Sequence, residues 1–312
     1  MTRTVARSAA ALAALVALSC GPKSTPPDAT YTLEVRYRPS VEGLPDQQRA
    51  ALTTAVDAAA EQIRAMITAG LVPTRVARYD CEGSLETVRI DERVHGLVVL
   101  VSYGALPYPA EPATLASSGP CIVRTRSRYP LVSVVQFNST SSYVTNALST
   151  GDVAFLQTVA LHELFHALGF GTIWVDYRGL VTGEATNDPV FRGSRAVAAA
   201  KDFDHAPSTL VGIPVENGGS QGTIGAHWRE SELDDELMTG FVEPGAPNPL
   251  SHASIASLGD LGYEVDLRQA DVDPAFVWPG AALRALSPST GISFGDDLIQ
   301  TTPVEVDELA VP

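Results

Sequence analysis

The residues His162, Glu163 and His166 form the pattern H-E-x-x-H within the segment HELFH. Side chains four residues apart project from one face of a helix, so the two imidazoles can bind one metal ion together. The intervening Glu163 then stands beside the metal, where its carboxylate can accept a proton. That combination is typical of zinc hydrolases. The alternative interpretation, a pair of hydrogen-bonded core histidines, does not explain a glutamate between them, because glutamate is rarely buried without a partner.

The flanking sequence predicts that these residues lie on a buried helix. Residues 149–152, STGD, offer capping oxygens, and an apolar stripe at helical spacing follows them. The stripe consists of Val153, Phe155, Leu156, Val159, Ala160, Leu164 and Phe165. Downstream, Gly169 and Gly171 bracket Phe170, and glycine tolerates the left-handed backbone of a helix end. We therefore expect the helix to end one turn after His166.

A catalytic zinc site needs a third protein ligand and keeps one position open for water. In the compact pattern H-E-x-x-H-x-x-G-x-x-H the third ligand follows the glycine directly, but Thr172 occupies that position here. The other candidates are four histidines and, for a different class of zinc site, three acids: His95, His205, His227, His252, Glu184, Glu216 and Asp176. We favour His227, because Met238 follows it at short range in the run ELMTG.

The order of these segments resembles leishmanolysin-like metallopeptidases, a metzincin family in which a long insertion separates the helix glycine from the third histidine. The resemblance is specific over residues 155–266 and weak before them. The matching segments are HELFHALGFGTIW at 162–174, PVENGGSQGTIGAHW at 214–228, ELMTGF at 236–241 and NPLSHASIASLGDLGYEVD at 248–266.

The resemblance implies roles for individual residues. One catalytic zinc ion would be bound by His162, His166 and His227, with Glu163 as the general base. Met238 would belong to the turn beneath the metal. Two further residues, Trp228 and Glu236, match the family motif, but the sequence assigns no role to either of them.

This set of groups is sufficient for hydrolysis. Zinc lowers the pKa of a bound water towards neutrality, and a nearby carboxylate can take its proton and pass it to the leaving amine. The metal also polarises the scissile carbonyl, so no nucleophilic Ser or Cys is needed. We therefore predict a zinc-dependent endopeptidase that acts on proteins or peptides. Two alternatives stay open: a non-catalytic exported adhesion or binding protein that retains the metzincin fold, and a zinc hydrolase of a non-peptide bond.

The expected fold is α+β, a two-lobed zinc protease. Before the metal-binding helix, the hydrophobic patterns predict strands at 31–37, 97–102 and 132–137 and an amphipathic helix at 46–67. A metzincin-like upper lobe would combine a mixed twisted sheet with the active-site helix. The lower lobe, mostly irregular and helical, would hold His227, the Met238 turn and a helix at 251–261.

The long segment from Thr172 to Ala226 must itself fold, because closing so long a loop around a metal is entropically unfavourable. A helix at 195–203 and a short strand at 211–215 are expected within it. Glycines at 218, 219, 222 and 225 then lead to His227, either as an ordinary surface loop or as a rim of the substrate cleft.

The N-terminus predicts export. Arg3 and Arg7 precede an apolar run at 9–18 that is too short to span a bilayer, which is typical of a secretory signal. The run ends in ALSC, which resembles a bacterial lipoprotein signal with lipid on Cys20, although Ala17 stands where Leu is usual. We expect either membrane attachment through Cys20 or plain secretion.

The predicted organisation follows from these boundaries. A signal peptide covers 1–19 and a linker 20–29, and a metzincin-like catalytic domain covers 30–270. Within that domain, the upper lobe extends over about 30–171, and the insertion and lower lobe over about 172–270. Residues 271–312 form a loop-rich C-terminal extension.

The charge of the chain bears on its binding partners, and its cysteines bear on disulfide formation. The net charge of −15 argues against nucleic acid, since a binding face would need Lys and Arg to neutralise phosphates. Apart from Cys20, only Cys81 and Cys121 remain, and in an oxidising compartment two such cysteines usually form a disulfide. The alternative, a Cys81 thiolate bound to the zinc in a latent form, lacks a recognisable prosegment motif.

Overall fold

The computed structural model describes residues 27–81, 88–106, 114–174, 178–184, 187–203, 206–219, 222–242, 245, 247–271, 292–293 and 302–308. The expected signal peptide and Cys20 lie outside these residues. Within the described residues, no helix has both the length and the apolar character needed to cross a membrane.

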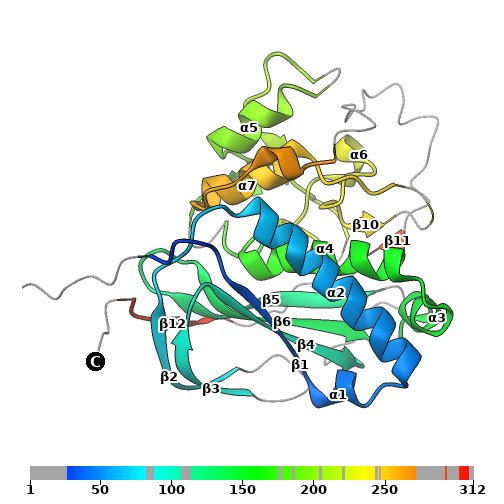
Figure 1. The fold of residues 1–312 in the computed structure, drawn as a ribbon. Helices are drawn as coiled ribbons and strands as arrows, with labels where there is room; N and C mark the ends of the chain where they lie inside the picture. Colours follow the sequence, from blue (N-terminus) through cyan, green and yellow to red (C-terminus); the bar gives the residue numbers. More distant parts are fainter. Residues whose placement is uncertain are drawn as a thin grey trace, which may run out of the picture.

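A five-stranded mixed sheet forms the base of the molecule (Figure 1), in the order β1-β4-β6-β5-β12. Strands β1, β4 and β6 run parallel, β5 is antiparallel to β6, and β12 is parallel to β5. Three of these strands were predicted from the sequence, whereas β5 and β12 were not. The bounds are β1 Leu33–Tyr37, β4 Leu97–Gly104, β5 Ala116–Arg124, β6 Pro130–Asn138 and β12 Val304–Val306.

The central strand β4 is buried on both faces, which explains its continuous apolar run from Leu97 to Val101. In β4, Leu97, Val99 and Val101 pack into the core on the helical side. The alternate residues, Val98 and Leu100, pack into a second core on the opposite face. The sheet therefore lies between two covering layers.

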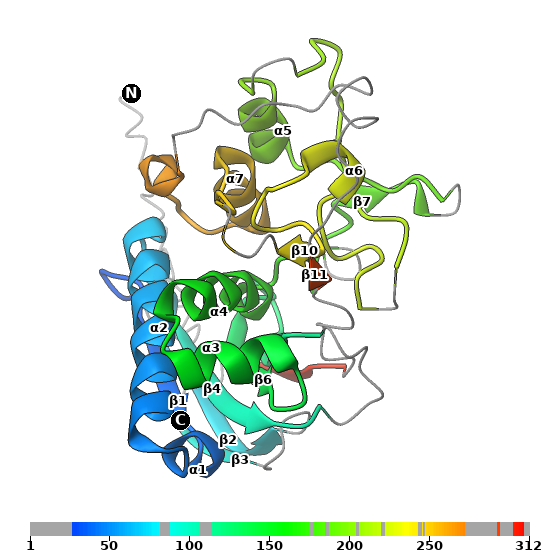
Figure 2. The ribbon, with the colours of Figure 1, turned by 90° about the vertical axis from the view of Figure 1, so that its right-hand side faces the viewer.

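Helices α2 (Asp46–Met66) and α4 (Val153–Leu168) lie side by side on one face of the sheet (Figures 1 and 2). The buried stripe of α2 is rich in alanine, which lets the neighbouring elements approach closely. It consists of Ala51, Leu52, Ala55, Val56, Ala59, Ala60, Ile63 and Met66. Two shorter helices, α1 (Pro39–Glu42) and α3 (Ser142–Thr150), complete this layer.

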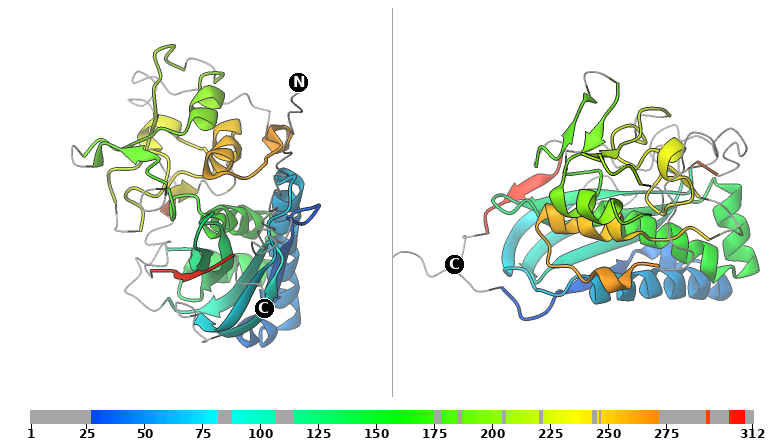
Figure 3. Two further views of the ribbon diagram at one scale, coloured as in Figure 1. Left: turned by 90° about the vertical axis from the view of Figure 1, so that its left-hand side faces the viewer. Right: turned by 90° about the horizontal axis from the view of Figure 1, so that it is seen from above.

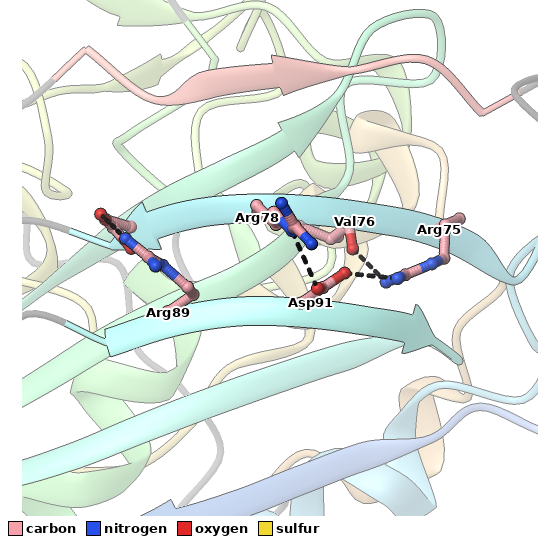
Figure 4. A network of polar contacts seen from close by, with 6 residues as sticks. Arg75, Val76, Arg78, Arg89 and Asp91 are labelled. Carbon is pink, nitrogen blue, oxygen red and sulfur yellow. Dashed lines mark hydrogen bonds and ion pairs between the residues drawn. The ribbon is translucent and has the colours of Figure 1, made fainter.

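A hairpin of β2 (Thr74–Cys81) and β3 (Val88–Val94) covers the opposite face. As predicted, Cys81 and Cys121 form a disulfide, which joins β2 to β5. On the hairpin, Asp91 contacts both Arg75 and Arg78 across the strands (Figure 4). Such exposed ion pairs contribute little to stability. The buried side of the hairpin and the disulfide therefore hold it in place.

The described residues between 172 and 271 lie on the side of α4 that faces away from the sheet (Figures 1 and 2). The elements of this part are β7 Val181–Thr182, β8 Val190–Phe191, α5 Ser194–Ala200, β9 Ile213–Pro214, α6 Glu230–Leu233, β10 Phe241–Val242, α7 His252–Leu261 and the 3-10 helix η2 Leu267–Gln269. The described part of the segment between the helix and His227 is folded, as expected from its length. Its helix α5 and its strand β9 were predicted, whereas β7 and β8 were not.

The end of the chain returns to both parts of the molecule. Strand β11 (Ile292–Ser293) pairs antiparallel with β10. Strand β12, which is red in Figure 3, forms one edge of the large sheet. The sequence shows no periodic pattern in this region, and the pairing partners come from distant segments. The two strands are thus set by tertiary contacts.

Candidate metal centre

Helix α4 positions two of the three histidines. It begins at Asp152, whose side chain accepts a hydrogen bond from the Phe155 N–H, and it ends at Gly169, which has a φ of +113°. The predicted helix and its glycine end are confirmed. Of the predicted capping residues, only Asp152 caps this helix, because Ser149 and Thr150 lie in the last turn of α3.

The structure brings His162, His166 and His227 together, and all three are fully buried. The Nε2 atom of His166 lies 3.0 Å from the Nε2 atoms of both His162 and His227. The Nε2 atoms of His162 and His227 lie 3.2 Å apart. Three imidazoles therefore present the same ring nitrogen to one point.

The other nitrogen of each ring faces a backbone carbonyl. The Nδ1 atoms of His162, His166 and His227 lie 2.8, 2.9 and 3.1 Å from the carbonyl oxygens of Leu237, Phe170 and Thr223. A carbonyl oxygen can only accept, so each Nδ1 carries the hydrogen and donates it. This fixes the tautomer in which Nε2 has a free lone pair, the form that binds a metal.

This donor set fits a divalent cation such as zinc. Tetrahedral coordination with Zn–N bonds of about 2.0–2.1 Å sets neighbouring nitrogens about 3.3 Å apart, close to the separations in this cluster. Three unprotonated Nε2 atoms at such distances repel one another, and a cation between them offsets that repulsion. Imidazole is a common zinc ligand, and three such ligands leave a fourth position open.

Glu163 lies between the two helical histidines and is fully buried. Its backbone is fixed to the sheet, because the Ser118 hydroxyl of β5 donates to the Glu163 carbonyl at 2.8 Å. One turn further along α4, the Ser133 hydroxyl of β6 donates to the Ala167 carbonyl at 2.7 Å. Two buried serines thus set the position of the helix, and of Glu163, on the sheet.

The approach to His227 is organised by Glu216, one of the acids considered as a ligand. Glu216 lies outside the metal cluster. Its carboxylate instead accepts from the backbone N–H groups of Asn217, Gly218 and Glu230. Its backbone N–H donates to the His227 carbonyl at 2.9 Å. Glu216 therefore holds both ends of the glycine-containing segment that leads to His227.

The remaining candidates that the structure describes are not brought together with the three histidines. His95 contacts Asp28 at 2.9 Å on the surface, Glu184 is exposed, and His252 is the first residue of α7. Among the described residues, the cluster of three histidines is the one group that could hold a metal ion. His205 and Asp176 lie outside the described residues.

The turn that carries Met238 lies next to His227 in the fold. The Trp228 N–H donates to the Met238 carbonyl at 3.0 Å, and Met238 is fully buried. Within this turn, Glu236 is also fully buried. Burial raises the pKa of the Glu236 carboxyl, and hydrogen bonds from Ser254, Ser251 and Met238 act in the opposite direction. The motif assigns no role to Glu236, and the structure places its carboxylate in a network with Met238, Ser251 and Ser254.

Comparisons with known proteins agree with the motifs. Leishmanolysin of Leishmania major is 34% identical over 122 residues, which cover 37% of this chain and 20% of that protein. The leishmanolysin homolog of Crithidia fasciculata is 29% identical over 161 residues, 50% of this chain and 23% of that protein. The ciliated left-right organizer metallopeptidase of Xenopus laevis is 28% identical over 141 residues, 40% of this chain and 19% of that protein.

The match therefore spans about a fifth of the length of these curated relatives. A family model described as leishmanolysin matches residues 88–283, a range that contains α4, the glycine-containing segment and the Met238 turn. Because this match extends over more than half of the 312 residues, the chain belongs to the leishmanolysin family of metallopeptidases.

Proposed function

We propose that this chain is a zinc-dependent endopeptidase that hydrolyses peptide bonds in proteins, with His162, His166 and His227 as zinc ligands. The observation that carries the proposal is the convergence of three Nε2 atoms within 3.0–3.2 Å of one another, with every Nδ1 donating to a backbone carbonyl. Membership of a metallopeptidase family supports the same conclusion.

In this proposal Glu163 is the general base. Bound zinc would supply Lewis-acid activation of water and of the scissile carbonyl. Glu163 accepts the proton of the attacking water and then delivers it to the leaving amine. Full burial favours this role, because a carboxylate in low-dielectric surroundings interacts more strongly with nearby charge than one in water. The Ser118 hydroxyl keeps the base in place by holding its backbone.

The part of the chain up to the end of α4 and the part that follows it would act as the two lobes of the enzyme. The sheet with α2 and α4 forms the upper lobe, over about 30–171, and the following residues to about 270 form the insertion and lower lobe. Substrate would bind between them, next to the histidines. We keep the extension at 271–312 as a separate unit in this proposal, although β11 and β12 pair with both parts.

Export completes the proposal. The disulfide between Cys81 and Cys121 supports an oxidising compartment, because disulfides are rare in reducing ones. The basic and apolar start of the chain supports a signal peptide at 1–19, with either lipid on Cys20 or release from the cell. Mass spectrometry of the N-terminal peptide of the exported protein distinguishes these two forms.

The test of function is cleavage of casein and of a peptide library by the purified protein, beside Glu163→Gln. We expect the unaltered protein to cleave both, with loss of cleavage on chelation. Glu163→Gln should retain about one zinc ion per chain. Its turnover should fall by about a hundredfold to ten-thousandfold, because the substituted amide cannot accept the proton.

The other outcomes are informative. Equal cleavage by both proteins would remove Glu163 from the mechanism. A zinc-loaded protein that cleaves no member of the library would contradict the peptidase proposal. If the protein then binds another protein without cleaving it, the alternative of a non-catalytic adhesion or binding protein is supported. If it hydrolyses an ester or a non-peptide amide, the alternative of a zinc hydrolase of a non-peptide bond is supported.

A further inference from the structure

We infer that Glu236 is a positioning residue for His162, and that its carboxylate acts on this ring through the single peptide group between Leu237 and Met238. The inference rests on the proposed metal site. It assigns a role to a buried acid that the reaction itself does not use.

The geometry joins the two residues through one peptide unit. The Met238 N–H donates to Glu236 Oε2 at 2.5 Å, and the Leu237 carbonyl accepts from His162 Nδ1 at 2.8 Å. These are the N–H and the C=O of the same planar group, which point in opposite directions in a trans peptide. A continuous line of hydrogen bonds therefore runs from the carboxylate to the imidazole.

Such a line has a chemical consequence. An anion at the N–H of an amide polarises it and makes its carbonyl oxygen a stronger acceptor. A stronger acceptor at Nδ1 makes the opposite nitrogen of the imidazole a better electron-pair donor and fixes the plane of the ring. In many metal sites a carboxylate contacts the histidine directly. Here a peptide group is inserted between Glu236 and His162.

The carboxylate is itself held in one position. Its Oε1 accepts from the Ser251 N–H at 3.0 Å, from the Ser251 hydroxyl at 2.7 Å and from the Ser254 hydroxyl. Ser251 is the N-cap of α7, so the positive end of that helix faces the carboxylate. Within the described part of the chain, no Lys or Arg forms an ion pair with Glu236. Burying an acid in this way is costly unless hydrogen bonds satisfy it.

The same network reaches the chain beside the third histidine. The indole N–H of Trp228 donates to the Ser254 hydroxyl at 2.7 Å, and Trp228 directly follows His227. Ser254 therefore joins Glu236 to the residue after His227. The carbonyls that accept from His166 and His227 are those of Phe170 and Thr223, which belong to other peptide groups than the one that donates to Glu236. The effect of Glu236 should thus fall mainly on His162.

The test compares Glu236→Gln with Asp260→Asn in the full chain. Glu236→Gln keeps the shape but removes the charge and one acceptor. Asp260 is a matched control on α7, the helix that Ser251 caps, because its carboxylate also accepts two backbone N–H groups, those of Arg195 and Ala196, away from the histidines. The measurements are zinc affinity against a chromophoric chelator, the visible spectrum after cobalt(II) substitution, and the ring 1H–15N signals of the zinc-bound histidines.

For Glu236→Gln we expect about 10-fold to 100-fold weaker zinc binding and altered cobalt bands, as for other outer partners of metal ligands. Of the three histidine Nδ1–H signals, mainly that of His162 should move, whereas general loosening of the fold would move all three. Glu236→Asp, which keeps the charge, should recover part of the affinity. Asp260→Asn should leave zinc affinity and spectrum unchanged.

Zinc affinity and cobalt bands equal to those of the unaltered protein would overturn the inference, as would equal movement of all three signals. If Glu236→Gln does not fold, Ser254→Ala replaces it: weaker zinc binding with a shifted His162 signal supports the role, and no change overturns it. An unaltered protein that binds no zinc would instead contradict the proposed function. The two failures are therefore distinguishable.

Discussion

The carbonyl oxygen of Ala226 occupies the space into which a side chain at Gly171 would extend. A Cβ atom built on Gly171 would lie 2.2 Å from that oxygen, far inside van der Waals contact. Gly171 also has a φ of +69°, in the left-handed region. The turn after α4 and the residue before His227 therefore touch backbone to backbone. This contact brings the third histidine to the two on the helix.

Gly171→Ala should accordingly weaken the metal centre. The methyl group must displace Ala226, and the left-handed backbone costs about another 1–2 kcal/mol for a residue with a Cβ atom. We expect a lower melting temperature and weaker zinc binding, measured by calorimetry and chelator competition. Gly179→Ala is the control, because its φ is +61° but no atom of the described residues lies within 4 Å of the added Cβ. Equal zinc affinity in both variants would contradict the role of this contact.

His227→Ala should remove one of the three proposed ligands. We expect the zinc content of the purified protein to fall sharply and cleavage to be lost, since two histidines on one helix cannot complete a catalytic site. His95→Ala is the control, because that ring is exposed and contacts Asp28. Atomic absorption on both variants provides the measurement. Full zinc content in His227→Ala would reassign the third ligand.

Removal of the metal should destabilise the fold. The three Nε2 atoms lie 3.0–3.2 Å apart, and a cation between them would offset the repulsion of their lone pairs. A ligand that binds only the folded state at 100 times its Kd stabilises it by about 2.7 kcal/mol. Thermal unfolding with and without a chelator should therefore show a lower midpoint for the chelated protein, recovered by added zinc. An unchanged midpoint would argue against a cation at this site.

Ser118→Ala should affect catalysis more than metal binding. The substitution removes the hydroxyl that donates to the Glu163 carbonyl, while the histidine contacts stay in place. Loss of a buried hydrogen bond of this kind costs about 0.5–1.5 kcal/mol. If the bond stabilises the transition state, its loss lowers kcat by up to about tenfold. We expect kcat to fall with zinc content unchanged. Ser133→Ala, which removes the equivalent bond to Ala167, should have the smaller effect on kcat.

Loss of the disulfide should lower stability without changing the chemistry. Cys81 and Cys121 are separated by 40 positions in the sequence, and closing a loop of that size is worth about 4 kcal/mol in the chain-entropy model. The bridge joins the β2–β3 hairpin to β5, on the face of the sheet opposite α4. The double variant Cys81→Ser/Cys121→Ser should unfold at a lower denaturant concentration than the unaltered protein. Below the midpoint of its unfolding transition, it should still cleave substrate. Loss of cleavage in the folded protein would contradict this separation.

The sequence alone determined the features that depend on local spacing. The four-residue interval of His162 and His166 is a property of any α-helix, and Gly169 ends that helix because it tolerates a left-handed backbone. The β-branched run at 97–102 predicted β4, and the apolar segment at 132–137, interrupted by Ser133 and Gln136, predicted β6. The amphipathic pattern predicted α2 and helix-forming alanines predicted α5, and a helix at 251–261, observed as α7, was also expected.

Tertiary structure decided what depends on distant partners. β12 has little local signal and forms only because β5 offers an open edge. The apolar side chains of the β2–β3 hairpin, such as Val76 and Ile90, are buried only because the hairpin packs against the sheet. The position of His227 depends on the contact of Gly171 with Ala226, and the backbone carbonyls that orient the rings carry no sequence signature. Glu236 could be seen in the motif, but its link to His162 through one peptide group exists only in the folded chain.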